Sequence, residues 1–572
     1  MAFDGFITKS IITELNKTII GAKVNKVYEP NKNEVLLSLY NNGKNYSLNL
    51  CANPELCRIC LTSYSKPNPQ NAYNFCMLLR KYLVGGKIVK ISNYDLERTV
   101  EIQFECYNEL NDLVIRKLFI EIMSRQSNII LTNNQNMIID TLKHFDNTRE
   151  LLPAHEYVFA PITKISFLEI NSFEKFLEII KTSGSIISLS KFFIDTFIGF
   201  SKPFIKECLK TLKISDTNYS ENDLAKIFDY LRSIINNFGT TNIYCKKISD
   251  KDYTLLFGEV PESNVIDEIT PINSFIDDFY YQKEQDSIFD SSRTNLLKIV
   301  SVSLKKVYKK IENINLKLKE CEKMDTFRLY GELLTANLYK FSSSPNLVEV
   351  IVENYYDNNN PIKIPLDNSL SVSKNIEKYY KKYNKLKNAL SIVTEQKKEA
   401  VKELDYIESI VFNLSNARNL NDINGVYEEI SQNVVTKKEI SKKEKNKITK
   451  KQDSNKIDLE STTIDGYTVY IGKNNVQNDY ISLKFAAPND IWFHVQKLHG
   501  SHVLLKNTEN LDIDEVPENI LFNCARLAKE NSKASDSLNV CVDYCFAKFV
   551  KKASGAKPGM VIYNNFKTII VK

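Results

Sequence analysis

Two stretches decide the fold: LKIVSVSLKKVYKKIENINLKLKEC (297–321) and YYKKYNKLKNALSIVTEQKKEAVKELDYIESIVFNL (379–414). In both, apolar residues recur at alternating steps of three and four. The first seam consists of Leu297, Val300, Leu304, Val307, Ile311, Ile314, Leu318 and Cys321. The second consists of Tyr379, Tyr383, Leu386, Leu390, Val393, Lys397, Ala400, Leu404, Ile407, Val411 and Leu414, with one polar break at Lys397. This heptad spacing predicts two coiled-coil helices.

The segment between the seams predicts a small β insertion. Residues 348–352 and 362–364 have strand character around the Asn-rich turn Asp357–Asn360. We therefore expect an antiparallel two-helix arm over residues 289–430, with 379–414 reaching about 54 Å at about 1.5 Å per residue. The alternative is that both helices are buried in a bundle, but charged residues crowd the other heptad positions and favour an arm.

Residues 1–160 predict an α+β domain with antiparallel pairing. An amphipathic helix is expected over 6–20, and alternating apolar residues around the turn Asn41-Asn42-Gly43 predict a hairpin over 35–50. Further strands are expected at 100–106, 113–123 and 128–131.

Residues 161–288 predict a mostly helical domain without strong strand signals. The segment Phe197-Ile-Gly199-Phe-Ser201-Lys-Pro203 predicts a helix, a Gly turn, a Ser N-cap and a second helix. It is either a helix-hairpin-helix whose turn amides bind a phosphate or an ordinary turn between helices. A single glycine leaves both alternatives open.

The C-terminal part predicts a linker followed by a compact domain. Residues 437–451 hold eight Lys and two Glu, a local charge of +6 that equals the net charge of the whole chain. We expect 431–457 to be a mobile Lys-rich linker. Residues 458–572 alternate strand signals with one helix at about 516–531. Because the signs nearly balance elsewhere, a basic binding site must be a local patch.

Composition excludes several classes of protein. With 572 residues, 43% hydrophobic and 26% charged, the chain is a multidomain protein and neither disordered nor collagen-like. No window approaches the roughly 18 consecutive apolar residues of a membrane span. The N-terminus lacks the features of a secretory signal, and eleven scattered Cys fit a reducing compartment. We expect a cytoplasmic protein.

Three of the five His lie in one segment, Asp490-Ile-Trp492-Phe-His494-Val-Gln-Lys-Leu-His499-Gly-Ser501-His502. A metal site lacks an acid or Cys at a known ligand spacing, and Lys497 lies among the imidazoles. The competing interpretation is a polar surface that presents imidazole, amide and indole groups to RNA. Trp492, the only Trp, is either a core anchor or a stacking platform, and its apolar neighbours favour the core.

Four lysines, Lys548, Lys551, Lys552 and Lys557, surround the loop Ala553–Gly559. The loop is not a Walker A motif, because Pro follows the Lys and no Gly precedes at the required spacing. Clustered Lys on a Gly/Pro loop suits a nucleic-acid backbone, although a solvated loop is the usual alternative. Cys57 and Cys60 form a C-x-x-C, but a strand would place them on opposite faces, which disfavours zinc.

No catalytic constellation is present, so we expect neither an enzyme nor a cofactor. Glu97-Arg98 ends a polar loop before a strand. A second polar set ends another strand and comprises Glu121, Met123, Arg125, Ser127 and Asn128. Alone, these are ordinary surface residues.

Motifs along the whole chain resemble the NFACT family. In the N-terminal part they are Asp4-Gly5, Asn53-Pro54, Pro67–Pro69, Phe75–Arg80, Gly85-Gly86 and Glu121–Leu131. In the arm they are Tyr330–Asn337 and Tyr379–Tyr383. In the C-terminal NFACT-R domain they are Gly472–Asp479, Asp490–His494, Gly500–Val503, Val542–Tyr544 and Gly555–Gly559. They occur in the family's order, which makes the resemblance specific.

This resemblance implies ribosome quality control. Bacterial members bind a large ribosomal subunit obstructed by peptidyl-tRNA, recruit alanyl-tRNA and promote template-free alanine tailing of the nascent chain, which marks it for degradation. The implied partners are rRNA and proteins of the large subunit, tRNA (tRNA-Ala by analogy), the peptidyl-tRNA nascent chain complex and a small RNA-binding protein, RqcP. Peptide-bond chemistry would belong to the ribosome, and the location would be cytoplasmic and ribosome-associated.

The resemblance also assigns residues. The tRNA-binding acidic–Arg pair falls on Glu97 and Arg98, with Glu where Asp is common, and the strand-end motif has Ser124 where Gly is usual. The segment after Pro153 begins with Ala154 and lacks the expected Gly, which puts that turn in question. Residues 1–160 also resemble the N-terminal domain of formamidopyrimidine-DNA glycosylases, but Ala2 and Phe3 replace the catalytic Pro and Glu.

A function from another class stays open, because family members are also described as fibronectin-binding surface proteins. The absent signal, the cysteine pattern and the polar arm favour the ribosomal role.

Overall fold

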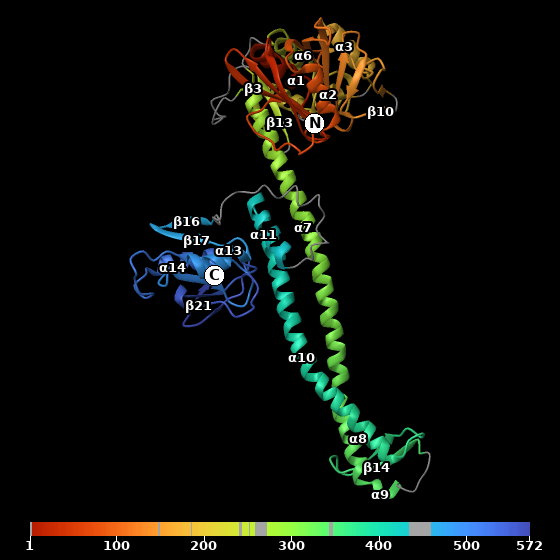
Figure 1. Cartoon of the computed structure of the whole chain (residues 1–572). Helices are drawn as coiled ribbons and strands as arrows, with labels where there is room; N and C mark the ends of the chain where they lie inside the picture. Colours follow the sequence, from red (N-terminus) through yellow and green to blue (C-terminus); the bar gives the residue numbers. More distant parts are fainter. Residues whose placement is uncertain are drawn as a thin grey trace. The chain divides into compact units, whose positions relative to one another are not determined.

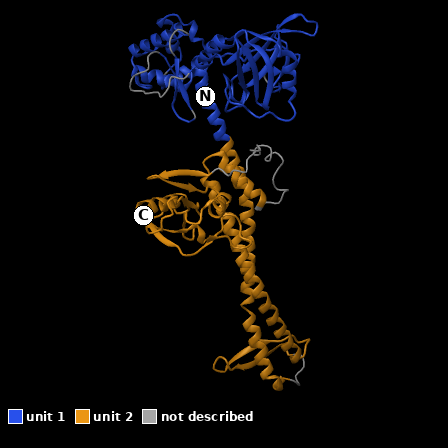
Figure 2. Cartoon of the chain, turned by 60° about the vertical axis from the view of Figure 1, so that its left-hand side comes forward, with its two compact units in different colours: residues 1–287 blue, residues 288–572 orange. Residues whose placement is uncertain are grey.

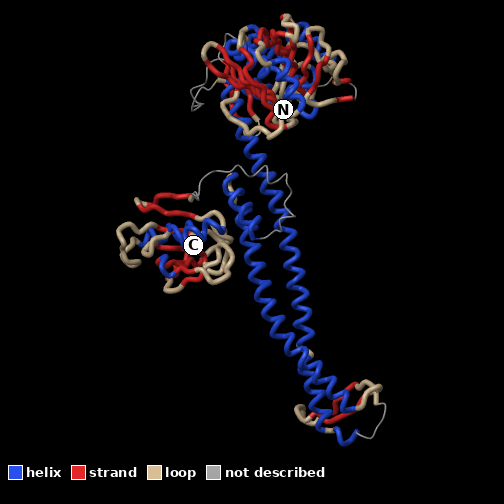
Figure 3. Tube along the Cα trace, in the orientation of Figure 1, coloured by secondary structure: helices blue, strands red, loops and turns tan. Residues whose placement is uncertain are grey.

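A computed structural model describes residues 3–146, 149–184, 186–238, 243–250, 252–257, 271–341, 347–433 and 459–572. The chain is a mixed α+β protein that divides into two compact units, Met1–Ser287 and Ile288–Lys572 (Figure 2). Strands are concentrated in unit 1 and in the C-terminal domain of unit 2, and long helices lie between them in sequence (Figure 3). Within the described ranges, no helix is both long enough and apolar enough to span a membrane.

Unit 1 is built on a nine-stranded antiparallel sheet in the order β4-β3-β2-β1-β5-β6-β7-β8-β9 (Figure 1). Its strands are β1 (Lys23–Asn31), β2 (Glu34–Asn41), β3 (Lys44–Cys51), β4 (Arg58–Leu61), β5 (Lys87–Asn93), β6 (Thr99–Tyr107), β7 (Leu113–Glu121), β8 (Asn128–Asn133) and β9 (Ile138–Thr141). The predicted helix is α1 (Gly5–Ile19), and α2 (Asn74–Leu83) was not predicted. The predicted hairpin is β2–β3, and Asn42 and Gly43 both have positive φ, as a type I′ turn requires.

The rest of unit 1 is mostly helical, as predicted. Its elements are β10 (Phe145–Asp146), β11 (Glu150–Leu151), α3 (Phe173–Thr182), α4 (Leu189–Thr196), α5 (Lys202–Leu212), α6 (Glu221–Asn236), β12 (Ile243–Lys247), β13 (Tyr253–Phe257) and the first turns of α7 (Ile272–Cys321). The hairpin β12–β13 escaped prediction because its strands have five residues each and lack alternation. One hydrophobic core extends from Phe3 to Tyr280 and so crosses the predicted domain boundary at residue 160.

The Gly199 turn joins α4 and α5 as predicted. Gly199 has φ 83°, and Ser201 caps α5 by accepting from the Phe204 amide. The turn packs onto the chain's own N-terminal segment: the Gly5 amide donates to the Gly199 carbonyl at 3.0 Å, and a Cβ on Gly199 would lie 2.5 Å from Leu96 Cβ. The turn therefore packs against the chain's own N-terminal segment through its carbonyl and Cα side, and both alternatives of the sequence analysis stay open.

The predicted two-helix arm is present in unit 2. Between α7 and α10 (Val372–Asn416) lie α8 (Met324–Ala336), α9 (Leu338–Phe341), β14 (Glu349–Asn354) and β15 (Asn360–Pro365), the predicted insertion. Every seventh residue is buried: in α7, Val300, Val307, Ile314 and Cys321, and in α10, Val393, Ala400, Ile407 and Leu414. The helices are antiparallel, because Arg293 bonds Ser415 while Lys310 bonds Glu403. At about 1.5 Å per residue, the 45 residues of α10 extend about 68 Å.

The C-terminal domain is a six-stranded antiparallel sheet in the order β16-β17-β19-β18-β20-β23. Its strands are β16 (Glu460–Ile464), β17 (Tyr467–Ile471), β18 (Ile491–Val495), β19 (Val503–Leu505), β20 (Val540–Phe546) and β23 (Lys567–Val571), with β21 (Val550–Lys551) and β22 (Ile562–Tyr563) in a separate hairpin. The predicted helix, α14 (Glu518–Glu530), packs on one face of the sheet. The other face packs against Ile481, which directly follows α13 (Asn475–Tyr480), a helix missed by the sequence analysis.

The predicted Lys-rich linker lies largely outside the described residues. Its first residues, 431–433, belong to α11 (Leu420–Asn433), so the helical region ends later than expected. Residues 434–458 are not described.

Candidate nucleic-acid interfaces

The two motifs that were predicted to bind tRNA meet at one end of neighbouring strands in unit 1. Thr99, the first residue of β6, pairs with Glu121, the last residue of β7. Directly beyond this pair, the Ile122 amide donates to the Arg98 carbonyl at 3.0 Å. Residues 97–98 and the turn at 123–127 therefore form one surface, although 25 positions separate Arg98 from Met123 in the sequence.

Within this surface, two of the predicted residues build the turn. Ser127 Oγ accepts from the Met123 amide at 2.8 Å, and the Asn128 amide group bonds both the N–H (2.9 Å) and the C=O (2.8 Å) of Lys143. Ser127 and Asn128 are fully buried. Their prediction as tRNA contacts is wrong, because their polar atoms are satisfied inside the protein. Arg125 remains exposed at the tip, and Met123 is partly exposed.

Glu121 is also internal. Its carboxylate makes a bidentate ion pair with Arg149, whose Nη2 lies 2.7 Å from Oε1 and whose Nη1 lies 3.2 Å from Oε2. The same carboxylate accepts a hydrogen bond from the Tyr157 hydroxyl at 2.8 Å. The exposed fraction of Glu121 is 1%, so direct contact with tRNA is excluded. The questioned turn nearby does form, with Ala154 in the left-handed region at φ 66°.

Arg98 lies beside a buried acid. Asp4 Oδ1 accepts from the Ile7 amide at 2.9 Å and caps α1, while Oδ2 accepts from Ser201 Oγ at 2.5 Å. Burial raises the pKa of Asp4 to about 6, and the Ser201 hydrogen bond and the Arg98 charge oppose that rise. Arg98 and Glu97 are both partly exposed, so this surface offers charged groups to a ligand.

The C-x-x-C pair is buried in unit 1. Cys57 and Cys60 flank Arg58 at the edge of the sheet, and both are fully buried. Burial raises the pKa of Cys60 to about 12, which keeps its sulfur protonated.

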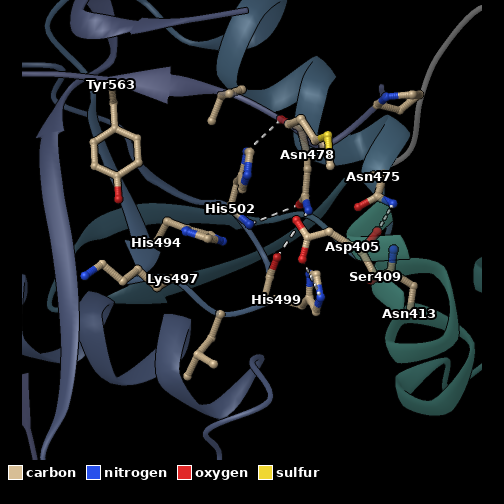
Figure 4. Close-up of a pocket in the computed structure, with 16 residues that line it drawn as sticks. Asp405, Ser409, Asn413, Asn475, Asn478, His494, Lys497, His499, His502 and Tyr563 are labelled. Atoms are coloured by element: carbon tan, nitrogen blue, oxygen red, sulfur yellow. Dashed lines mark hydrogen bonds and ion pairs between the residues drawn. The ribbon is translucent and has the colours of Figure 1, made fainter. Parts of the chain in front are cut away.

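In unit 2, the His-rich segment borders a cavity of about 380 Å³ between the C-terminal domain and α10 (Figure 4). Asp405, Ser409 and Asn413 line it from α10. Asn475 and Asn478 line it from α13, and the β18–β19 segment contributes His494, Lys497, His499 and His502. Gly559, in the turn before β22, and Tyr563, in β22, complete the lining.

Four of the predicted RNA contacts lie in the core of the domain. Trp492 is fully buried and donates from Nε1 to Ser482 Oγ at 2.9 Å, so it cannot stack on RNA. Asp490 accepts from the Ala487 and Asn507 amides, and the Ser501 amide donates to the Asn531 carbonyl. The His502 ring Nδ1 lies 2.7 Å from Ser482 Oγ. Trp492 and Asp490 are satisfied internally, and their assignment as RNA contacts is wrong. The bond of Ser501 involves its backbone only, and His502 lines the cavity, so the assignment of these two residues stays a prediction.

The imidazoles that border the cavity are neutral at physiological pH. Burial lowers the pKa of His494 to about 4, against the attraction of Asp543. Burial also lowers the pKa of His502 well below its usual value, and that of His499, which lies 3.3 Å from Asp405. These rings act as hydrogen-bonding groups rather than cations.

The four lysines divide into two kinds. Lys552 pairs with Asp479, which also accepts from the Gly559 amide at 2.9 Å, and Lys557 lies 5.7 Å from the centre of the Tyr406 ring. These two lysines hold the loop against α13 and α10. Lys548 lies over Phe546 at 4.6 Å, and Lys551 is exposed on β21.

A buried polar network behind the cavity was not predicted. Asn475 Nδ2 donates to Glu429 Oε1 at 2.9 Å and to Ser409 Oγ at 2.8 Å, and the Tyr406 hydroxyl donates to Glu429 at 2.8 Å. Burial raises the pKa of Glu429 to about 7. These residues fix the C-terminal domain on α10 and α11, and no local sequence pattern indicates that they meet.

Two known domain families match successive stretches of this chain. Residues 4–449 match the description "NFACT N-terminal and middle domains", and residues 459–565 match "NFACT protein RNA binding domain". The chain therefore belongs to the NFACT family.

Curated relatives cover the full length. The chain is 34% identical over 580 residues to "Rqc2 homolog RqcH" of Bacillus subtilis, covering 100% of this chain and 98% of that protein. It is 30% identical over 585 residues to the protein of the same name from Streptococcus pneumoniae, with the same coverage. A solved structure, the N-terminal part of the fibronectin/fibrinogen-binding protein from Streptococcus suis, aligns with 49% of this chain and 99% of its own at 28% identity and a TM-score of 0.40.

Proposed function

We propose that this protein is a ribosome quality control factor that binds tRNA through unit 1 and ribosomal RNA through its C-terminal domain. It recruits alanyl-tRNA to large subunits obstructed by peptidyl-tRNA and promotes template-free alanine tailing of the stalled chain. It acts in the cytoplasm as an elongation factor without its own catalytic centre, and peptide-bond formation belongs to the ribosome.

The observation that carries the proposal is the convergence of Glu97-Arg98 with the turn at 123–127. Arg98 and Arg125 can each donate two parallel hydrogen bonds to phosphate or guanine, and Glu97 can accept from a base amine. Two internally bonded acids lie next to these side chains: Asp4 caps α1, and Glu121 pairs with Arg149. Full-length similarity to proteins named RqcH supports the same assignment.

Capture of tRNA by the purified, tagged full-length chain tests the proposal. We expect Glu97→Ala with Arg98→Ala, and separately Arg125→Ala, to lose most of the co-purifying tRNA without a change in melting temperature. The matched control is Glu174→Ala with Lys175→Ala, an adjacent exposed acid–base pair on α3. Equal tRNA recovery from all variants would refute the assignment.

The same preparations address the ribosomal part of the proposal. Sequencing the captured RNA should show tRNA-Ala enriched together with large-subunit rRNA, and nascent chains released from those subunits should carry C-terminal alanines. Fibronectin capture on intact cells, without association with large subunits, would instead support the surface-adhesin function.

A further inference from the structure

The cavity between α10 and the C-terminal domain contains an amide without a partner. Asn413 is 6% exposed, lies on α10 between the buried residues Ile410 and Leu414, and lines the cavity (Figure 4). Its Nδ2 has no hydrogen-bond partner within the described part of the chain. A buried donor left unsatisfied is costly, and an apolar residue at this position would pack without that cost. Nδ2 itself has almost no accessible surface, and a 180° rotation of the amide group exchanges it with Oδ1, so Asn413 can present a donor or an acceptor to something that enters the cavity.

A second hydrogen-bonding group faces the same space from the opposite wall. The His494 ring makes no hydrogen bond with any described residue. It packs against two other rings, with its centroid 5.7 Å from that of Trp492 and 5.2 Å from that of His502. As a neutral imidazole, His494 offers one donor and one acceptor. Lys497 adds a charge, on an exposed residue that lines the cavity.

These groups define the kind of ligand that fits. The lining contains one lysine, Lys497, and one aspartate, Asp405, so the cavity has little net charge and does not select a simple anion. Within the described ranges, no three His, Cys, Asp or Glu residues could hold a metal ion. The volume of about 380 Å³ lies in the range of small-molecule sites. A planar, uncharged group with donors and acceptors along its edge matches Asn413 and His494, and a phosphate attached to it matches Lys497.

We propose that this cavity receives a single unpaired nucleobase of an RNA, with its polar edge on Asn413 and His494 and its phosphate near Lys497. The inference deepens the RNA-binding role proposed above and rests on it. Unpaired bases are the features of RNA that proteins read most often by hydrogen bonding. At this site the C-terminal domain and α10 would both contact the same nucleotide, in addition to contacts of the domain with the phosphate backbone.

The only Trp in the chain provides the measurement. The Trp492 ring contacts His494 and lies 4.9 Å from Tyr563, both of which line the cavity, so its emission reports occupancy. The full-length protein is titrated with AMP, GMP, CMP and UMP, and with ribose 5-phosphate and inorganic phosphate as controls. We expect saturable changes with one or more nucleotides and none with the two controls.

Two variants test the residues. Asn413→Leu should weaken nucleotide binding roughly tenfold or more without lowering the melting temperature, because it removes an unsatisfied buried donor. Lys497→Ala lies at an exposed position that does not endanger folding, and it should abolish the preference for AMP over adenosine while adenosine still binds. A purely structural Asn413 would leave the titration unchanged.

The proposal is overturned if no nucleotide gives a saturable change, if ribose 5-phosphate binds as tightly as the nucleotides, or if Asn413→Leu binds as the parent does. These titrations need neither tRNA nor ribosomes. Loss of tRNA capture with intact nucleotide binding would refute the proposed function alone, and the reverse pattern would refute this site alone.

Discussion

The two candidate RNA surfaces use their polar groups differently. At the strand ends of unit 1, Arg98 and Arg125 lie close in the fold to the ion pair between the buried Glu121 and the partly exposed Arg149. In the cavity of unit 2, most of the polar side chains that line the wall are imidazoles and amides, while Lys552 outside the cavity pairs with Asp479. The first surface is suited to phosphate, which salt screens, and the second to hydrogen bonding, which salt affects little.

The largest expected effect on stability comes from removing the buried Glu121 carboxylate next to the first surface. Glu121→Ala leaves the partly exposed Arg149 without its carboxylate and the buried Tyr157 hydroxyl without its acceptor, and we expect unit 1 to lose about 3 kcal/mol in free energy of unfolding. Urea denaturation followed by circular dichroism measures this loss. Arg125→Ala, at an exposed position of the same surface, should stay within about 0.5 kcal/mol. A loss below about 1 kcal/mol for Glu121→Ala would mean that its bonds to Arg149 and Tyr157 do not stabilise unit 1.

The buried polar network behind the cavity contains Glu429, which should make the stability of unit 2 depend on pH. The folded-state pKa of Glu429, about 7, is above its ordinary value of 4.5. The folded protein thus binds this proton more tightly than the unfolded chain, and stability is lost as pH rises from about 4.5 towards 7. Glu429→Gln keeps an acceptor for Tyr406 and Asn475 and carries no charge. It should stabilise the protein by on the order of 2 kcal/mol at pH 8, and by less at pH 5.5.

Melting temperatures at the two pH values measure this difference. Glu403→Gln, on an exposed stretch of α10, is the control and should show no such pH dependence. A constant gap between Glu429→Gln and the parent across this pH range would contradict a titrating Glu429.

Local patterns were sufficient for the elements of the fold but not for the sites. The heptad seams, the β2–β3 hairpin and α14 depend on residues a few positions apart, so the sequence displays them directly. Glu121 appeared to be a surface residue because its partner Arg149 lies 28 positions away. Asn413 occupies a polar position of a coiled coil, and only the docking of the C-terminal domain, about 60 residues later, makes it part of a cavity.

The resemblance to a family added information that periodicity could not. Ser124 and Ala154 were singled out because a glycine was expected at or next to each of them, and both adopt positive φ, at 52° and 66°. The backbone of the family's turns is thus kept at a cost in strain, while the residue types differ.

A moderate effect is expected from relieving that strain. Ser124→Gly and Ala154→Gly should each stabilise unit 1 by about 0.5–1 kcal/mol, because a left-handed conformation costs a non-glycine residue about 1–2 kcal/mol and glycine's greater freedom in the unfolded chain offsets part of the gain. Thermal unfolding measures the change. Ala225→Gly, inside α6, is the matched control and should destabilise by about 1 kcal/mol. Destabilisation by all three would show that the turns are not strained.

The smallest effect concerns the lysine loop and sharpens the contrast between charge and hydrogen bonding. Lys551 is exposed, whereas Lys552 is already paired with Asp479. If both touch an RNA backbone, Lys551→Ala should reduce the slope of log affinity against log salt by roughly 0.7–0.9, the value for one phosphate contact. Lys552→Ala should reduce it by less, because Asp479 already neutralises that charge. Affinity of the full-length protein for large-subunit rRNA, measured across a salt series, gives both slopes. An unchanged slope in Lys551→Ala would remove the loop from the RNA interface and leave the neutral cavity as the part of the C-terminal domain that recognises RNA.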